Sequence, residues 1–100
     1  MPKLITIWWR DIPMQVIAKE GRQTEKRILN KRFQFAVDKA AMNAGKKSYG
    51  DYIEEMGRDE RTVEGELEAL VDAEIKRLDA AYTKDVLHAL IASGGEGTRL

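Results

Sequence analysis

The residues that could do chemistry are few, and the most suggestive ones lie near the amino end. Trp8 and Trp9 are followed directly by a cation and a carboxylate, Arg10 and Asp11. Indole rings stack on bases or fill pockets of a protein partner, and arginine pairs with phosphates and carboxylates. This combination is typical of a binding surface, and it contains no nucleophile with its activating base.

No catalytic or metal-binding motif accompanies these residues. The chain has no cysteine, which excludes disulfides and thiolate chemistry, and its one histidine, His88, has no nucleophile placed near it in any motif. The carboxylate pairs Glu54–Glu55 and Asp59–Glu60 have basic neighbours, which favours a solvated surface over acid–base work or a cation site. The glycines form neither a phosphate loop nor a dinucleotide fingerprint. We therefore expect no cofactor, and we favour a non-catalytic protein over an enzyme.

Charge divides the chain into two halves. Residues 1–50 carry eleven Lys/Arg against four Asp/Glu, a net charge of +7, while residues 51–100 carry six against thirteen, a net charge of −7. The two halves could simply attract each other within one domain. Alternatively, the basic half could face an anionic partner, such as nucleic acid, a phosphorylated cofactor or an acidic protein.

Three predicted strands position the candidate residues. Apolar and β-favouring side chains occupy both alternating sets of residues 3–10, which is typical of a central strand covered on both faces. Asp11 and Pro13 predict a bend, because proline fixes φ and has no N–H. Residues 14–19 and 22–29 then form a hairpin about a Glu-Gly turn, and the polarity of the second of these strands marks it as an edge.

Helices are predicted for the rest of the chain. Asn30 caps a helix whose inner stripe, spaced three or four residues apart, contains Phe33, Ala36, Val37, Ala40, Ala41 and Ala44. Ser48 opens a helix of about two turns, residues 57–61 form a charged connector, and Thr62 caps the longest helix. The outer face of that helix is predicted to be acidic, with Glu64, Glu66, Glu68, Asp72, Glu74 and Asp79. Thr83 interrupts or caps an apolar pattern that continues to a glycine pair.

Together these elements predict an α+β fold, in which a three-stranded antiparallel β-meander is followed by three to four helices packed on one face. Residues 1–95 are predicted to form a single domain, and residues 96–100 a disordered tail. No apolar run is long enough to span a membrane, and the amino terminus lacks the features of a secretory signal. We therefore expect a cytoplasmic protein that does not bind a membrane.

The predicted fold gathers the candidate binding residues on one rim of the sheet. Neighbouring strand residues point to opposite faces, so one indole of the Trp8–Trp9 pair should join the core. The other indole should be either covered by later helices or exposed. The hypothesised binding residues are Trp8, Trp9, Arg10, Asp11, Pro13, Lys19, Arg22, Lys26, Arg27 and Arg32.

Several short motifs within residues 3–55 carry a resemblance to a known family. They are Trp9-Arg10-Asp11-Ile12-Pro13, Gln15-Val16-Ile17, Lys19 with Gly21-Arg22, Arg32-Phe33, Ala36, Asp38, Ala40-Ala41-Met42 and Ala44-Gly45. In combination they resemble the small bacterial domain family called virulence factor, which is related to a terminal domain of the conserved virulence factor C proteins. The resemblance implies a stand-alone cytoplasmic bacterial protein without assigned catalytic residues. It also implies an accessory subunit of folate- or corrinoid-dependent one-carbon enzymes.

Three functions are compatible with these features. The leading hypothesis is a non-catalytic interaction or accessory protein that docks a protein partner or forms a homodimer. The second is a nucleic-acid-binding protein that uses the basic hairpin, with an affinity that falls steeply with salt. The third is a small enzyme or ligand carrier in which Arg10, Asp11, Arg32 and Asp38 converge on a pocket.

Overall fold

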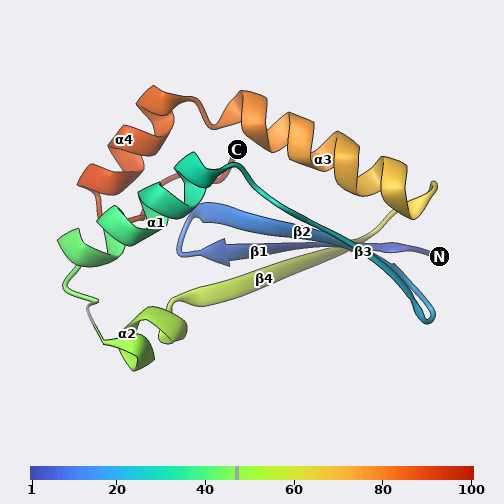
Figure 1. Ribbon diagram of the computed structural model, residues 1–100, viewed down its shortest axis with the longest axis horizontal. Helices are drawn as coiled ribbons and strands as arrows, with labels where there is room; N and C mark the ends of the chain where they lie inside the picture. The colour runs from blue at the N-terminus through green and yellow to red at the C-terminus, as the bar shows by residue number, and fades with distance from the viewer. Residues whose placement is uncertain (47) are drawn as a thin grey trace.

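The structure is a computed structural model that describes residues 1–46 and 48–100. The elements in chain order are β1 (Lys3–Trp9), β2 (Ile12–Glu20), β3 (Gln23–Ile28), α1 (Lys31–Asn43), α2 (Tyr49–Glu54), β4 (Met56–Thr62), α3 (Leu67–Ala81) and α4 (Lys84–Ala92). The strands form one antiparallel sheet in the order β3-β2-β1-β4. Figure 1 shows α1, α3 and α4 on the same side of this sheet, with α2 at one end. The predicted α+β class is confirmed, but the sheet has four strands where three were predicted.

β1 is the predicted central strand, since it pairs with β2 on one side and with β4 on the other. The turn predicted between the first two strands is confirmed, but it lies earlier than residues 11–13, because the chain reverses at Arg10 and Asp11 and Pro13 already belongs to β2. Pro13 opposes Trp8 at a shift in the β1–β2 register, and such bulges are where a sheet tolerates proline. β3 lies at an edge, as its polarity predicts.

The connector predicted at residues 57–61 is also wrong, because these residues form most of β4. The strand pairs with β1 along its whole length, from Met56 opposite Trp9 to Thr62 opposite Lys3. A half-buried strand is recognised by alternating apolar and polar residues, and β4 lacks this pattern because it contains four consecutive charged residues. Every residue of β4 after Met56 is exposed. At the edge of a sheet the same charges discourage pairing with another molecule.

α1 and α2 begin where the sequence predicts. The Asn30 side chain accepts a hydrogen bond from the Arg32 backbone N–H, and the Ser48 hydroxyl accepts one from the Asp51 backbone N–H. Five residues of the predicted α1 stripe are buried, namely Phe33, Ala36, Val37, Ala40 and Ala41. Four of these five are small or β-branched, which lets the helix lie close to the structures that it covers.

α3 begins later than predicted, because Thr62 is the last residue of β4 and not a helix cap. The helix starts at Leu67, and Glu66 before it makes no side-chain capping hydrogen bond. Glu74, predicted on the acidic outer face, is buried with 7% of its surface exposed. Arg77 holds it through two hydrogen bonds of 2.8 Å, which satisfy both carboxylate oxygens.

The remaining segments close the helical layer. Thr83 lies where the helical pattern is interrupted, since α3 ends at Ala81 and α4 begins at Lys84. It also caps α4, because its hydroxyl accepts a hydrogen bond from the Val86 backbone N–H. The residues after α4, predicted to be disordered from residue 96, pack back on the domain. There, the Leu100 backbone N–H donates to the Tyr82 hydroxyl. Among the described helices, none is both long enough and apolar enough to cross a membrane.

Candidate functional site

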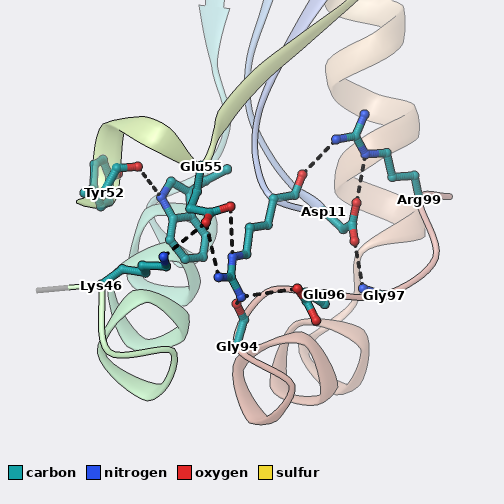
Figure 2. A network of polar contacts seen from close by, with 10 residues as sticks. Asp11, Lys46, Tyr52, Glu55, Gly94, Glu96, Gly97 and Arg99 are labelled. Carbon is teal, nitrogen blue, oxygen red and sulfur yellow. Dashed lines mark hydrogen bonds and ion pairs between the residues drawn. The ribbon is translucent and has the colours of Figure 1, made fainter. Parts of the chain in front are cut away.

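The predicted site residues Arg10 and Asp11 form the two-residue turn between β1 and β2. Arg10 has a φ of 51°, in the left-handed region that residues other than glycine rarely adopt. The Arg10 backbone N–H donates to the Glu55 carbonyl at 2.9 Å, and the Asp11 backbone N–H donates to the Gly95 carbonyl at 2.9 Å. Two distant segments therefore hold this turn, namely the α2–β4 junction and the residues after α4 (Figure 2).

The Arg10 side chain ties these segments together. Its guanidinium donates to the Gly94 carbonyl at 3.1 Å and to the Glu55 carboxylate at 3.3 Å, and Lys46 lies 3.4 Å from the same carboxylate (Figure 2). The hydrogen bond from Arg10, together with the positive charges of Arg10 and Lys46, lowers the pKa of the Glu55 carboxyl. Because the Arg10 side chain is only 16% exposed, little of it is accessible to an outside ligand.

Asp11 is also engaged within the domain. Its carboxylate accepts hydrogen bonds from the Gly97 backbone N–H at 2.8 Å and from Arg99 Nε at 3.0 Å (Figure 2). The Arg99 guanidinium in turn lies 4.4 Å from the centroid of the Trp8 ring, a cation–π contact that covers the indole. Pro13 is fully buried. These contacts make the β1–β2 turn a structural junction.

Both tryptophans are buried, so the alternative of an exposed indole is wrong. Trp8 is 4% exposed and donates to Asp59 Oδ2 at 2.9 Å. Trp9 is 0% exposed, donates to the Tyr52 carbonyl at 2.9 Å, and stacks on the Tyr52 ring with the centroids 5.8 Å apart. α2 therefore supplies the cover for the second indole.

Two candidate cations pair with the acidic α3 helix. Arg27 Nε lies 3.2 Å from Asp72, and Arg32 Nη1 lies 2.9 Å from Asp79. Arg32 Nη2 also donates to the carbonyls of Asp79 and Tyr82. For these residues, the oppositely charged halves of the chain attract each other within the domain, which is the first of the two interpretations of the charge pattern.

The four residues considered for a ligand pocket do not share a site. Arg10 and Asp11 lie at the β1–β2 turn, and Arg32 contacts the end of α3. Asp38 accepts a hydrogen bond from Gln34 on the exposed surface of α1. Within residues 1–46 and 48–100, no group of three or more His, Cys, Asp and Glu residues is placed to hold a metal ion.

The three remaining candidates, Lys19, Arg22 and Lys26, lead to a different surface. Arg22 lies in the exposed turn of the hairpin, while Lys19 and Lys26 alternate with the residues that face the helices. The strand registers align three rows across this side of the sheet. We call this surface the open face, and it consists of Lys3, Ile5, Ile7, Gln15, Ile17, Lys19, Thr24, Lys26, Ile28, Arg58, Glu60 and Thr62.

Isoleucines form the apolar part of the open face. Ile28 is 79% exposed, Ile7 and Ile17 are half-buried, and Ile5 is 4% exposed. Ile5 lies in a hollow of about 210 Å³ whose other lining residues include Lys3, Lys19 and Arg58. These isoleucines lie outside the core cluster between the sheet and the helices. The expectation that β1 is covered on both faces therefore holds at Trp9, where α2 packs, but not along Ile5 and Ile7.

The open face is also basic. Four bases, Lys3, Lys19, Lys26 and Arg58, accompany one acid, Glu60, which gives a net charge of +3. Glu60 lies 3.1 Å from Lys3 and 3.6 Å from Arg58. Lys19 and Lys26 make no ion pair with any residue that the structure describes. Sequence reasoning identified these two lysines but missed the isoleucines, although Ile5 and Ile7 occur at the two-residue spacing of one sheet face.

The fold and this surface define a class: a small α+β protein whose sheet is covered by helices on one side and presents apolar and basic residues on the other. A protein-family model described as "Virulence factor" matches residues 7–91. The chain therefore belongs to the virulence factor family, and the likeness extends beyond residue 55 through α3 and into α4. No curated protein and no solved structure matches the chain.

Proposed function

We propose that this protein is a small accessory protein that docks a partner protein on its open face. The observation that carries the proposal is a group of isoleucines without a helix over them, exposed at Ile28 and half-buried at Ile7 and Ile17, beside two lysines that make no ion pair within the described residues. Burial of an isoleucine side chain at an interface contributes about 1.5–3 kcal/mol to the free energy of binding. Apolar patches on a protein surface often mark interaction sites. Ile28, at 79% exposure, has the most to gain from a partner.

The charge of the open face favours a different protein over a second copy. Two open faces packed against each other would bring a net charge of +3 against +3, and like charges facing across an interface are unfavourable. A partner with carboxylates around an apolar centre would complement Lys19 and Lys26 directly. The homodimer hypothesis is therefore less well supported for this surface than a hetero-complex.

The resemblance to the virulence factor family adds a more specific expectation about the partner. It implies an enzyme of folate- or corrinoid-dependent one-carbon metabolism, for which this protein would be an accessory subunit. Identification of the co-purifying partner by mass spectrometry tests this part of the proposal separately from the docking surface.

The docking surface is tested by affinity purification of the tagged protein from its native cells. We expect the wild type to recover a partner in stoichiometric amounts, and the double variant Lys26→Glu/Ile28→Glu to lose it. Lys76→Glu is the control, because it reverses one lysine charge, as Lys26→Glu does, at an exposed position of α3, in the layer that covers the other side of the sheet. Recovery of the same partner by the double variant would refute the proposal.

A nucleic-acid-binding function is the second candidate, favoured by the four bases on one face. Both indoles are buried, so base stacking on an aromatic side chain, the usual companion of such a charged groove, is missing from the open face. If four phosphates were neutralised, the affinity would fall with a log–log salt slope of roughly −3 to −4. An absence of binding to single- or double-stranded oligonucleotides at about 50 mM salt would remove this candidate.

A further inference from the structure

A second surface lies in the helical layer, in a groove between α1 and α4. Its floor is formed by Ala36, Leu87 and Ile91, and its volume is about 290 Å³. The groove continues along both helices to Asn43, whose side chain donates to the Ile91 carbonyl at 2.9 Å. Figure 1 shows the two helices side by side on the sheet face opposite the open face. The groove and the open face therefore lie on different sides of the molecule.

The groove is apolar in a region where α1 should be polar. Phe35 lines it and is 57% exposed. Met42 does not line the groove, but it lies seven residues later on the same side of α1 and is 60% exposed. Lys39 lies between them, with Nζ 5.5 Å from the centroid of the Phe35 ring. Large apolar side chains on the outer face of a helix cost solubility unless a partner covers them.

The charges around the groove have one sign. Among the described lining residues, the ionisable ones are Arg32, Lys39, Lys84 and His88. Arg32 pairs with Asp79, whereas Lys39 and Lys84 have no ion pair within the part of the chain that the structure describes. The acids adjacent in sequence, Asp38 and Asp85, do not line the groove. Asp38 is engaged by Gln34, which also lies 3.5 Å from the Tyr52 hydroxyl of α2.

The shape of the groove indicates what kind of molecule fits it. From Arg32 to Asn43 the groove follows twelve residues of α1, and the distance along the helix axis is about 16 Å, or three helical turns. A long, open groove between two helices suits a third helix better than a small metabolite, which would be enclosed on most sides. The lysines along it select for carboxylates.

We propose that the α1–α4 groove binds an acidic amphipathic helix of a partner protein. The apolar stripe of that helix packs on Phe35, Leu87 and Ile91, and its carboxylates pair with Lys39 and Lys84. This site does not depend on the open face. Together the two surfaces would let one small protein hold two partners, or two parts of one partner, on different sides.

The test uses the intact protein and a displayed library of helix-forming peptides with randomised surface positions. We expect the selected peptides to share apolar residues at i, i+4 and i+7 with flanking Asp or Glu. Anisotropy titration of the most enriched peptide, labelled with fluorescein, should show at least a tenfold weaker affinity for Lys39→Glu/Lys84→Glu and for Phe35→Ser. The matched control Lys76→Glu should bind as the wild type does.

Thermal unfolding of the variants separates lost binding from lost structure, because all the altered side chains are exposed and the melting temperature should not change. The proposal is overturned if the library yields no enriched peptide, or if the enriched peptides are not acidic. It is equally overturned if their affinity is unaffected by Lys39→Glu/Lys84→Glu. If binding is lost only in Lys26→Glu/Ile28→Glu, the peptide occupies the open face, and the groove is not the site.

Discussion

Replacing Gly95 by alanine tests the burial of Trp9. Gly95 has a φ of 91°, and an added Cβ would lie 2.8 Å from Trp9 Cζ3 and 3.4 Å from Arg10 Cβ. The indole cannot withdraw, because its N–H donates to the Tyr52 carbonyl and its ring stacks on the Tyr52 side chain. The left-handed backbone costs an alanine about 1–2 kcal/mol, and overpacking adds about 1–3 kcal/mol. We therefore expect Gly95→Ala to lower the free energy of unfolding by about 2–5 kcal/mol.

This loss is a large share of the total stability of a 100-residue domain, about 5–15 kcal/mol. At about 4–8 °C per kcal/mol, the melting temperature should fall by roughly 10 °C or more. Thermal and urea unfolding, followed by tryptophan fluorescence, measure the change. The matched control is Gly50→Ala, at a position in α2 with no positive φ and with no atom within 4 Å of an added Cβ. An alanine there should stabilise the helix by about 0.5–1 kcal/mol.

The two glycine variants should therefore change stability in opposite directions. If Gly95→Ala unfolded at the wild-type temperature, Trp9 would not be packed beneath the residues after α4. The conclusion that both indoles are sealed inside the domain would then be wrong, and the rim at Trp9 would again be a candidate binding surface.

Three further changes test other parts of the structure. Arg10 lowers the pKa of Glu55 below the ordinary value of 4.5. The ionised carboxylate therefore contributes its full stabilisation when the pH is above 4.5, and this contribution is lost as the pH falls through the pKa of the folded state. Glu55→Gln should therefore lower the free energy of unfolding, measured with urea at pH 7, by roughly 1 kcal/mol. The difference between variant and wild type should disappear in acid, and a difference that does not depend on pH would contradict this. Arg77→Ala leaves Glu74 buried without its strongest partner and should lower the free energy of unfolding by about 1–3 kcal/mol. Adding Glu74→Leu to this variant should restore most of the loss. If the losses of the two single variants simply added in the double variant, the pairing would be contradicted. Lys26→Glu/Ile28→Glu should leave the unfolding free energy within about 0.5 kcal/mol, because both side chains are exposed, and a larger loss would show that this part of the open face packs inside the domain.

Local signals in the sequence predicted the parts of the fold that depend on local physics. Asn30, Ser48 and Thr83 each cap a helix because a side-chain oxygen there reaches an unpaired backbone N–H, and such a cap depends only on near neighbours. The buried stripe of α1 follows from its spacing alone. The central position of β1 follows from the apolar residues in both of its alternating sets, which are typical of a strand inside a sheet and not of an edge strand.

Features that depend on distant segments could not be predicted. β4 has no apolar alternation, and only its pairing with β1 makes it a strand. Because β4 returns beside β1, it carries α2 to the end of the sheet, where Tyr52 covers Trp9. The same return path leaves Ile5 and Ile7 without a helix over them. A strand covered on both faces and a strand with an exposed apolar face have the same residue pattern, so the open face emerged only from the structure.

Isoleucine-methyl NMR of the complex tests the docking of a partner on the open face most directly. The chain is labelled at its isoleucine methyl groups, and the partner recovered by affinity purification is added. We predict that the signals of Ile17 and Ile28 shift, with smaller changes at Ile5 and Ile7, while those of Ile12 and Ile75, on the helix side of the sheet, remain in place. Shifts confined to isoleucines outside the open face, with Ile17 and Ile28 unchanged, would contradict the proposal.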